Sequence, residues 1–349
     1  MNSSPPQSDD QPSANFATTC LQKSTKLFVT LSDVSVVIAG TAALFAFAAR
    51  YSWAADLCCQ FRVQLLFFLV PTAIVYWLWR RGQFAWWVLL CAVANLIPLS
   101  PYVIPNSSSI AEVSKDTATT RIMTLNLLKG NQHHDEVVAY ITDIDPDIFI
   151  AIESDQEWTE GLKPIQQAYP HRHIIDDRGT SSIAVYSRIP VNSMNVYHST
   201  RQRLPSLDFT VTIEQQPVRI FATHPFIPLA QETARMRNSQ LDEIETMLKE
   251  PGSRILLGDF NCVPWSPHLT DVLRTTNLTP AGYGRGLRPT WYRRARAYGP
   301  LRQTWLFALK LDHVLLSDDL AVVDHRIGPC LGSDHRPVTV DFVRVKKSK

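Results

Sequence analysis

The chain has little net charge for its length. Its 349 residues include 34 Lys and Arg against 32 Asp and Glu, which gives a formal charge of +2. A strongly basic or acidic balance would create a field that attracts nucleic acid or an acidic partner, and no such global field exists here. The length is sufficient for two domains, and the composition differs between segments of the chain.

Charged residues are scarce in the first third of the chain. Between Leu27 and Leu99 there are six: Asp33, Arg50, Asp56, Arg62, Arg80 and Arg81. Three apolar runs, at about 27–49, 61–79 and 84–103, approach the length of about 20 residues that a helix needs to cross a bilayer. Tryptophans near the ends of these runs suit the membrane interface. Residues 26–104 therefore predict a three-helix transmembrane anchor.

The composition of this segment allows two alternatives to an anchor. A buried helical bundle would also be apolar, and a cleaved signal peptide would also lie near the start of the chain. A signal peptide is a single short apolar segment, whereas here a long first run is followed by two more. The transmembrane interpretation is therefore favoured over both alternatives.

Polar segments flank the predicted anchor. Residues 1–25 are rich in Ser, Pro, Asp and Gln, which predicts a disordered tail. Residues 105–119 are small and polar, which predicts a linker. The remaining residues, 120–349, have the composition of a soluble α/β protein.

The distribution of Lys and Arg predicts the orientation of the anchor. Lys23 and Lys26 precede the first run, and Arg80 and Arg81 connect the second to the third. Positive residues favour the cytoplasmic side. Three crossings would then place the domain after the anchor outside the cytoplasm, most simply at a bacterial inner membrane. Arg residues in the opposing loop weaken this prediction.

Short apolar runs dominate residues 120–349. These runs predict strands, and they outnumber the segments with helical periodicity by about two to one. The segments with helical periodicity predict helices at 134–144, 159–169, 232–250 and 267–276. Several consecutive strands have no helix between them, so much of the pairing should be antiparallel. The pattern predicts an α+β domain with a two-layer sheet core and helices outside it. No internal repeat is visible.

Cysteine is rare in this second part of the chain. Cys262 and Cys330 are the only two cysteines outside the anchor and tail. In an oxidising compartment they could form a disulfide. Two free thiols are an equally good interpretation, and the sequence leaves the choice open.

Polar side chains fall at the ends of the apolar strands. An acid, an amide or an imidazole ends or begins strand after strand: Asn126, Glu153, His224, Asp259, Asn261, Asp312, His313, Asp334 and His335. One Asp or Asn can serve a turn for local reasons. The repetition predicts that these groups meet at one edge of the sheets in a single pocket.

The residue types in this pocket predict its chemistry. Carboxylates and amides without thiolates suit a hard ion such as Mg²⁺ or Mn²⁺. Histidines next to carboxylates suit general acid–base catalysis. This combination is well suited to the attack of water on phosphorus, because the metal stabilises charge on the phosphoryl oxygens.

The motifs also resemble a known family. MTLNLLKGN, DPDIFIAIESD, SSIAVYSRIP, ATHP, LLGDFNCVPWS, LDHVLLS and GSDHRPV follow the order found in the endonuclease/exonuclease/phosphatase superfamily. The resemblance extends from Arg121 to about Val345 and is most specific in GDFN and SDHRPV. It implies a four-layer α/β/β/α sandwich with two sheets between helices. It also implies a metal-dependent phosphoesterase.

The resemblance implies a role for each matching residue. The metal ligands would be Glu153, Asn126 and Asp334. The catalytic residues would be His335 held by Asp312, Asp259 acting on the attacking water, and His224 on a phosphate oxygen. Asn261, Asn126 and His224 would bind the substrate phosphate. His313 occupies a variable position and is not expected to be catalytic.

The sequence departs from the family at two positions. Ile152 precedes Glu153 where Gln is frequent, and Ser182 stands where Gly is frequent. Neither change removes a catalytic group, but both obscure the subgroup. Tyr169, Arg172 and Arg178 are weak candidates for the residue that covers the phosphate in several members.

The substrate is the open question at this level. The segment Tyr283–Gln303 has six arginines and several aromatics, which suits nucleic acid or anionic lipid headgroups and equally a solvated loop. The expected partners are a phosphate-ester substrate, either nucleic acid or a phospholipid headgroup, and membrane lipid, without an obligate protein partner. The alternative function is a membrane-tethered scaffold that keeps the fold without catalysis.

Overall fold

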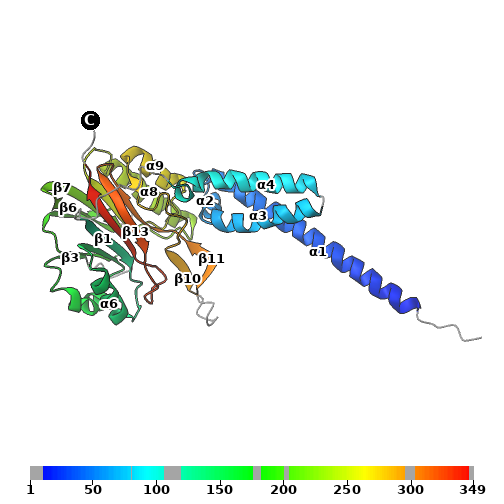
Figure 1. The fold of residues 1–349 in the computed structure, drawn as a ribbon, viewed down its shortest axis with the longest axis horizontal. Helices are drawn as coiled ribbons and strands as arrows, with labels where there is room; N and C mark the ends of the chain where they lie inside the picture. Colours follow the sequence, from blue (N-terminus) through cyan, green and yellow to red (C-terminus); the bar gives the residue numbers. More distant parts are fainter. Residues whose placement is uncertain are drawn as a thin grey trace, which may run out of the picture.

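The computed structural model combines an elongated helical part with a sheet-rich domain (Figure 1). It describes residues 11–79, 81–105, 119–175, 182–199, 204–294 and 303–345. The first ten residues, Arg80, Arg178 and nearly all of the predicted linker lie outside the described residues. So do residues 295–302 of the arginine-rich segment.

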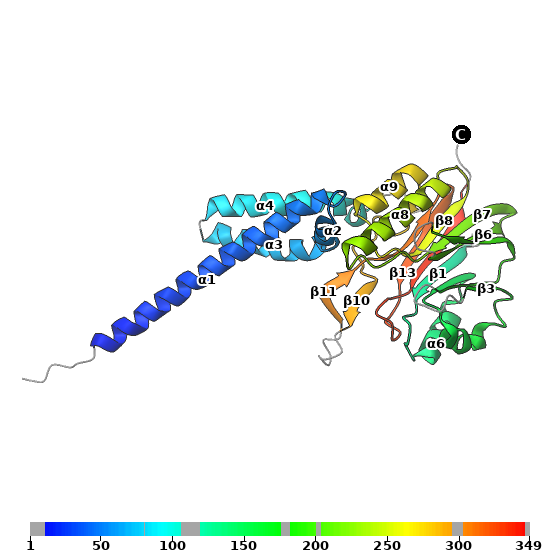
Figure 2. The ribbon, with the colours of Figure 1, turned by 180° about the vertical axis from the view of Figure 1, so that it is seen from behind.

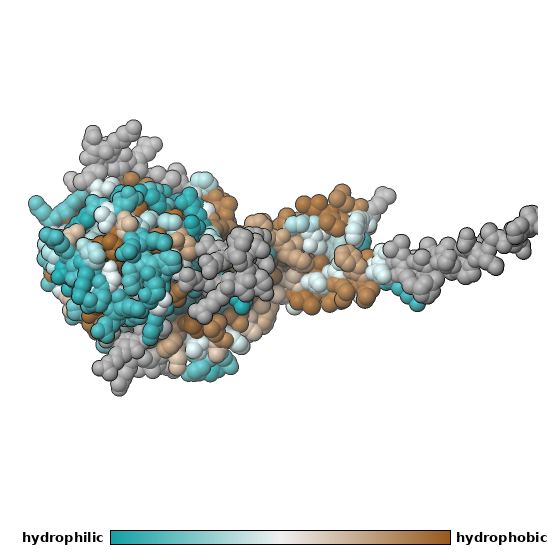
Figure 3. Space-filling model, turned by 90° about the horizontal axis from the view of Figure 1, so that it is seen from below, coloured by the Kyte–Doolittle hydropathy of each residue, from teal (hydrophilic) through white to brown (hydrophobic). Residues whose placement is uncertain are grey.

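The helical part corresponds to the predicted anchor. Its elements are α1 (Gln11–Phe45), η1 (Ala46–Ala48), α2 (Trp53–Gln60), α3 (Arg62–Leu78), α4 (Gly82–Leu96), η2 (Ile97–Leu99) and α5 (Ser100–Val103). Two described segments, Lys23–Ala48 and Gly82–Val103, are long and apolar enough to cross a membrane, and the α2–α3 pair, bent by 66°, is a third if it counts as one span. Apolar side chains cover the visible face of these helices, whereas the domain surface is largely hydrophilic (Figure 3).

The helix α1 begins earlier than the composition predicts. Residues 1–25 were expected to be a disordered tail, but the chain is helical from Gln11. The prediction is therefore wrong for residues 11–25. Adding residues to an existing helix is far easier than nucleating one, so the long apolar helix can extend into a polar segment with several good helix formers.

Polar contacts hold the helices together at two levels. Asp33 of α1 accepts hydrogen bonds from Tyr76 at 2.6 Å and from Arg81 at 2.8 Å, close to the turn between α3 and α4. Nearer the domain, Arg62 donates to the side chain of Asn95 at 2.5 Å. In an apolar environment unpaired polar groups are costly, and both Asp33 and Arg62 have a hydrogen-bond partner on another helix.

The domain contains two six-stranded sheets. The first has the order β13-β14-β1-β2-β4-β3 and the second β5-β6-β7-β8-β12-β9. Among the strands of the described residues, only the pairs β1–β2 and β7–β8 are parallel. A two-stranded ribbon is formed by β10 and β11. The strands are β1 (Thr120–Asn126), β2 (Ile148–Ile152), β3 (His171–Ile175), β4 (Ile183–Ser187), β5 (Val191–His198), β6 (Pro205–Ile213), β7 (Gln216–Thr223), β8 (Arg254–Asp259), β9 (Thr279–Pro280), β10 (Trp291–Arg294), β11 (Gln303–Leu309), β12 (Asp312–Leu316), β13 (Leu320–Ile327) and β14 (Val338–Arg344).

The hydrophobic core of the domain lies between the two sheets. Alternate residues of both sheets, such as Ile150 and Phe209, form one buried cluster. The opposite face of the first sheet packs against α6 (His134–Ile144) and α7 (Gln156–Gly161). The opposite face of the second packs against α8 (Gln231–Met247) and α9 (Pro267–Thr276). The domain is thus α+β, as predicted, with largely antiparallel pairing.

Sequence periodicity located the helices better than the edge strands. The expected helices at 134–144 and 267–276 have the bounds of α6 and α9. The strands β3, β10 and β11 were missed. β3 is an edge strand of the sequence HRHII, and β10 of the sequence WYRR belongs to the outlying ribbon. Such strands have no fully buried face, so they lack the apolar alternation that identifies a strand.

The domain packs directly against the end of the helical part (Figure 2). The backbone N–H groups of Gly284 and Gly286 donate to carbonyls of α5 at 2.9 and 2.8 Å. Trp265 donates from its indole to the carbonyl of Cys59 at 2.8 Å and contacts the ring of Tyr102. Trp265 therefore packs at the junction between helices and domain.

Candidate active site

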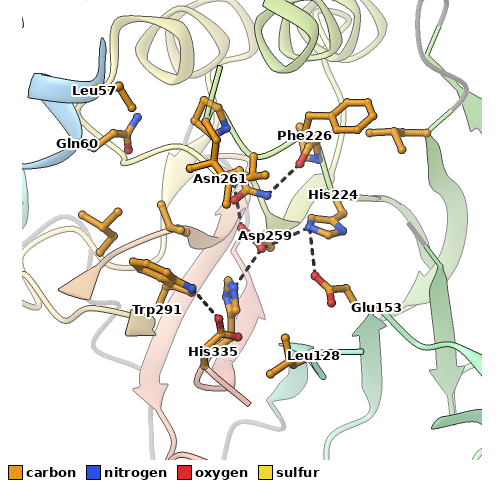
Figure 4. A pocket seen from close by; sticks show the side chains of 18 of the residues that line it. Leu57, Gln60, Leu128, Glu153, His224, Phe226, Asp259, Asn261, Trp291 and His335 are labelled. Atoms are coloured by element: carbon orange, nitrogen blue, oxygen red, sulfur yellow. Dashed lines mark hydrogen bonds and ion pairs between the residues drawn. The ribbon is translucent and has the colours of Figure 1, made fainter. Parts of the chain in front are cut away.

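The polar strand ends gather in one cavity, as the sequence predicts. The cavity has a volume of about 340 Å³. Of the predicted site residues, Glu153, His224, Asp259, Asn261, Asp334 and His335 line it (Figure 4). Asn126 and Asp312 lie behind them and hydrogen-bond to lining residues. His313 faces away, because its Nε2 donates to the carbonyl of Cys262 at 2.8 Å.

The sequence GDFN builds one wall through its backbone. Gly258 has a φ of +138°, and a Cβ there would lie 2.0 Å from the carbonyl oxygen of Thr223 on β7. Only glycine allows the two strands to approach this closely. Asn261 has a φ of +48°, and its N–H donates to Asp259 at 3.0 Å. The chain thus turns at once after β8, with Asp259 fixed at the turn.

Asp259 is the centre of the site. Its Oδ2 lies 3.4 Å from Nε2 of His335, 3.5 Å from Nε2 of His224 and 3.1 Å from Nδ2 of Asn126. Burial opposes ionisation of this carboxyl, but the adjacent imidazoles and the N–H of Asn261 outweigh burial and lower its pKa. Asp259 is therefore an ionised carboxylate surrounded by hydrogen-bond donors.

His335 lies between two carboxylates. Its Nδ1 is 2.8 Å from Asp312 Oδ2, while its Nε2 faces Asp259. Burial would lower the pKa of His335, but the charges of Asp312 and Asp259 prevail and raise it to about 10. The ring is thus held as an imidazolium with a fixed orientation. Thr290 supports the arrangement by accepting the backbone N–H of Asp312 at 3.0 Å.

Glu153 lies on the opposite side of Asp259. Its two carboxylate oxygens accept from Asn126 Nδ2 and from the N–H of Lys129, both at 3.0 Å. The backbone of Glu153 has a φ of +57°. Left-handed conformations of non-glycine residues cost free energy and are concentrated at functional sites. The strain aims this carboxylate into the cavity.

The donor set fits a hard divalent ion. Oδ1 of Asp334 is buried and has no hydrogen-bond partner among the described residues, while Oδ2 accepts from the indole of Trp291 at 3.0 Å. Together with Glu153 it supplies carboxylate oxygens, the ligands that Mg²⁺ and Mn²⁺ prefer. A second set has metal-like spacing: ligand atoms of Asp259, Asp312 and His335 lie within 4.8 Å of one another. In that set, however, the imidazole is already paired with both carboxylates.

Several weaker candidates are not at the site. The hydroxyl of Tyr169 donates to the carbonyl of Pro146 in the helical layer outside the first sheet, and Arg172 donates to backbone carbonyls nearby.

Cys262 and Cys330 both have free thiols, so the disulfide alternative is not formed. Cys262 is buried beneath α8 and α9.

Sequence reasoning missed the apolar wall of the cavity. Leu57 and Phe61 of the helical part line it beside one polar residue, Gln60. Residues Phe226 to Leu229, which begin two positions after His224, line it as well. The arginine-rich segment contributes Trp291, but none of its described arginines lines the cavity. The apolar wall could not be foreseen, because the sequence does not reveal that the anchor and the domain pack together.

Solved structures with the same fold were found. A zebrafish (D. rerio) TDP2 complexed with a single-strand DNA product is 16% identical, with a TM-score of 0.54, covering 65% of this chain and 100% of that one. An endonuclease/exonuclease/phosphatase from Beutenbergia cavernae DSM 12333 is 18% identical, with a TM-score of 0.52, covering 65% and 72%. The human nocturnin catalytic domain with a bound sulfate anion is 16% identical, with a TM-score of 0.50, covering 65% and 95%.

At these identities the solved structures show similarity of fold. A search of the curated proteins gives no match. The family model described as Endonuclease/Exonuclease/phosphatase family matches residues 123–335, which is more than half of the chain. These residues run from β1 to His335 and include every predicted site residue. The chain therefore belongs to the Endonuclease/Exonuclease/phosphatase family, whose members are hydrolases acting on phosphodiester bonds.

Proposed function

We propose that the protein is a membrane-anchored, divalent-metal-dependent phosphodiesterase. The observation that carries this proposal is the arrangement of His335, its partner Asp312 and His224 around the ionised Asp259. The imidazolium of His335 and the carboxylate of Asp259 lie side by side. The imidazolium can donate to a phosphate oxygen while the carboxylate accepts a proton from the attacking water. The packing of helices on both outer faces of the two sheets supports the four-layer sandwich of the family.

Each side chain has a role in this reaction. Asp259 orients the water and accepts its proton as the water attacks phosphorus. His335 donates a hydrogen bond to a phosphoryl oxygen, and Asp312 holds its ring. His224 and Asn261 bind further phosphate oxygens. Negative charge grows on the phosphoryl group during this step, and positioned donors stabilise it.

The metal ligands would be Glu153, Asn126 and Asp334. Such an ion, Mg²⁺ or Mn²⁺, would neutralise charge on the phosphoryl oxygens and the leaving group. Asn126 connects the two halves of the site, since its Nδ2 donates to both Glu153 and Asp259. Its position supports a role in aligning the metal carboxylate with the carboxylate that handles water.

The helical part is proposed as an anchor in a bacterial inner membrane, with the domain outside the cytoplasm. Its apolar surface and the candidate spans support the anchor. Lys23 and Lys26 belong to the first half of α1, and Arg81 lies in the turn between α3 and α4. Figure 1 shows both of these segments at the end of the helical part that is remote from the domain, which agrees with the positive-inside tendency. A reporter inserted after Pro105 that is active only in the cytoplasm should be inactive, and full activity would reverse this topology.

The catalytic proposal is tested on the full chain in detergent. We expect hydrolysis of bis-p-nitrophenyl phosphate with Mg²⁺ or Mn²⁺ that stops on chelation. His335→Gln and Asp259→Asn should each lower kcat by about 100-fold or more. His171→Gln on edge strand β3 is the control and should retain activity. Equal rates in the two site variants and the parent would contradict the assigned site, and complete inactivity of the parent would favour the scaffold alternative.

A further inference from the structure

The wall of the active-site cavity that faces the helical part is apolar. On that side the lining residues are Leu57, Phe61 and one polar residue, Gln60, from the helices and Phe226, Ile227, Leu309 and Leu311 from the domain. The polar catalytic groups lie on the other side, around Asp259 (Figure 4). One cavity thus joins a phosphate-binding end to an apolar end formed partly by the predicted anchor.

The rim of this cavity is also apolar and exposed. Ile227 and Leu229 are 46% and 72% exposed, although both are large aliphatic residues. They belong to the segment that follows His224, and Trp53 of α2 fixes this segment by donating from its indole to the carbonyl of Pro228 at 3.0 Å. Exposed apolar side chains beside membrane-spanning helices can enter the interfacial region of a bilayer.

The charges around the cavity argue against a long nucleic acid. A nuclease binds successive phosphates with Lys and Arg along a groove. Among the described residues that line this cavity there is neither Lys nor Arg. The site can bind one phosphate group through its catalytic residues and offers apolar surface beside it. An amphiphile, with a phosphate group and a hydrocarbon chain, is complementary to such a site.

From these observations we propose that the substrate is a lipid phosphate ester. Its hydrocarbon chain lies against Leu57, Phe61 and Phe226, while its phosphate lies at Asp259 and His335. The inference rests on the proposed function and adds the substrate class. Burial of the chain contributes binding free energy in proportion to the apolar area removed from water.

Two diesters with the same leaving group test this inference on the full chain. Methyl p-nitrophenyl phosphate and n-decyl p-nitrophenyl phosphate are compared with Mg²⁺ at one fixed detergent concentration. In both, water attacks phosphorus, the bond to the aryl oxygen breaks with its electron pair on p-nitrophenolate, and the water proton passes through Asp259 to solvent. We expect kcat/KM to be at least about tenfold higher for the decyl ester.

Variants of the apolar wall distinguish binding of the decyl chain in the cavity from simple partition of the decyl ester into detergent micelles. Leu57→Ser and Phe226→Ser should each lower the decyl-to-methyl ratio of kcat/KM by about threefold or more, whereas Phe226→Leu should largely preserve it. The matched control is Phe68→Ser, at a side chain of α3 that is 43% exposed and lies outside the cavity. A structural defect alone would lower both rates and leave the ratio unchanged.

The possible outcomes are distinct. A ratio near one in the parent, or a high ratio that neither serine variant lowers, overturns the lipid inference while the proposed phosphodiesterase stands. A single-stranded oligonucleotide hydrolysed with a higher kcat/KM than the decyl ester also overturns it, in favour of a nucleic-acid substrate. Hydrolysis of neither ester overturns the proposed function and the inference together.

Discussion

Arg237 of α8 and Asp56 of α2 form an ion pair of 2.7 Å across the junction between domain and helices. Both side chains are buried, with exposed fractions of 0% and 2%. The guanidinium also donates to the backbone carbonyl of Asn261 at 3.1 Å, so it joins the helical part to the turn that ends β8. One side chain, that of Arg237, thus contacts both the predicted anchor and the turn at the active site.

Removing Asp56 should destabilise the protein strongly. Asp56→Ala leaves the buried Arg237 without its counter-charge, which costs about 3–5 kcal/mol in comparable cases. Thermal unfolding in one detergent measures the effect. The control is Asp271→Ala, which breaks the more exposed pair between Asp271 and Arg50 at the same junction and should cost about 1 kcal/mol or less. Equal effects of the two variants would contradict the importance of the buried pair.

Gly258 should tolerate no side chain. In Gly258→Ala the Cβ would meet the carbonyl of Thr223 at 2.0 Å, so β7 and β8 must separate and Asp259 must move. We expect a loss of about 3 kcal/mol or more in unfolding free energy, with a loss of activity. Gly252→Ala is the control, because Gly252 also has a positive φ, of +147°, but nothing lies within 4 Å of its Cβ position. The difference in unfolding midpoint between the two variants isolates the clash.

Asp312 should set the basic limb of the pH–rate profile. Burial lowers the pKa of His335, but the charges of Asp312 and Asp259 together raise it to about 10, so the imidazolium persists to high pH. In Asp312→Asn the charge of Asp312 is lost, the pKa of His335 falls, and the basic limb of kcat/KM should move to lower pH. The rate below the limb should also drop, by about tenfold or more, because the ring loses its orientation. A profile unchanged in position would show that His335 does not act as the proton-bearing group.

Lys310 should make stability depend on pH. Burial lowers its pKa from 10.5 to about 8. Between these values the unfolded chain binds a proton that the folded chain has released, so the contribution of this group to stability rises with pH from about 8 to 10.5. Below pH 8 the buried charge costs about 3 kcal/mol.

Replacing Lys310 by Met should remove this cost. At pH 7 Lys310→Met should unfold at a higher temperature than the parent, and the difference should shrink as pH rises from 8 to 10.5. The control Lys163→Met changes a side chain that is 61% exposed, and its effect should stay small across the range. A constant difference for Lys310→Met would contradict a lowered pKa of the lysine.

The sequence predicted that the polar residues would gather in one cavity because they are tied to strand ends. A strand with alternating or continuous apolar residues must enter the core, so the polar residue at its end emerges at the sheet edge. This reasoning places Asn126, Glu153, His224 and Asp259 at one edge from the sequence alone. Helical periodicity likewise predicted α6 and α9 with their bounds. Edge strands such as β3 escaped it because they bury no complete face.

The contacts between the two parts of the chain could not be foreseen. Asp56 was visible as a charge within an apolar segment, yet its partner Arg237 lies 181 positions later. Likewise, Trp291 gave no local sign that its indole would bind Asp334. Pairings between distant residues depend on how finished elements pack, and local periodicity carries no information about such packing.

The sequence by itself determined the family, the edge where the polar groups meet and the apolar character of the first hundred residues, because these follow from local pattern and residue chemistry. Only the tertiary structure decided that the helices close the active-site cavity. That closure arises from burial of Val263, Trp265 and Leu311 against the helical part, together with the Asp56–Arg237 pair. The hydrophobic effect is non-directional, so it does not specify which apolar surface packs against which. The partner surfaces are therefore known only from the folded structure.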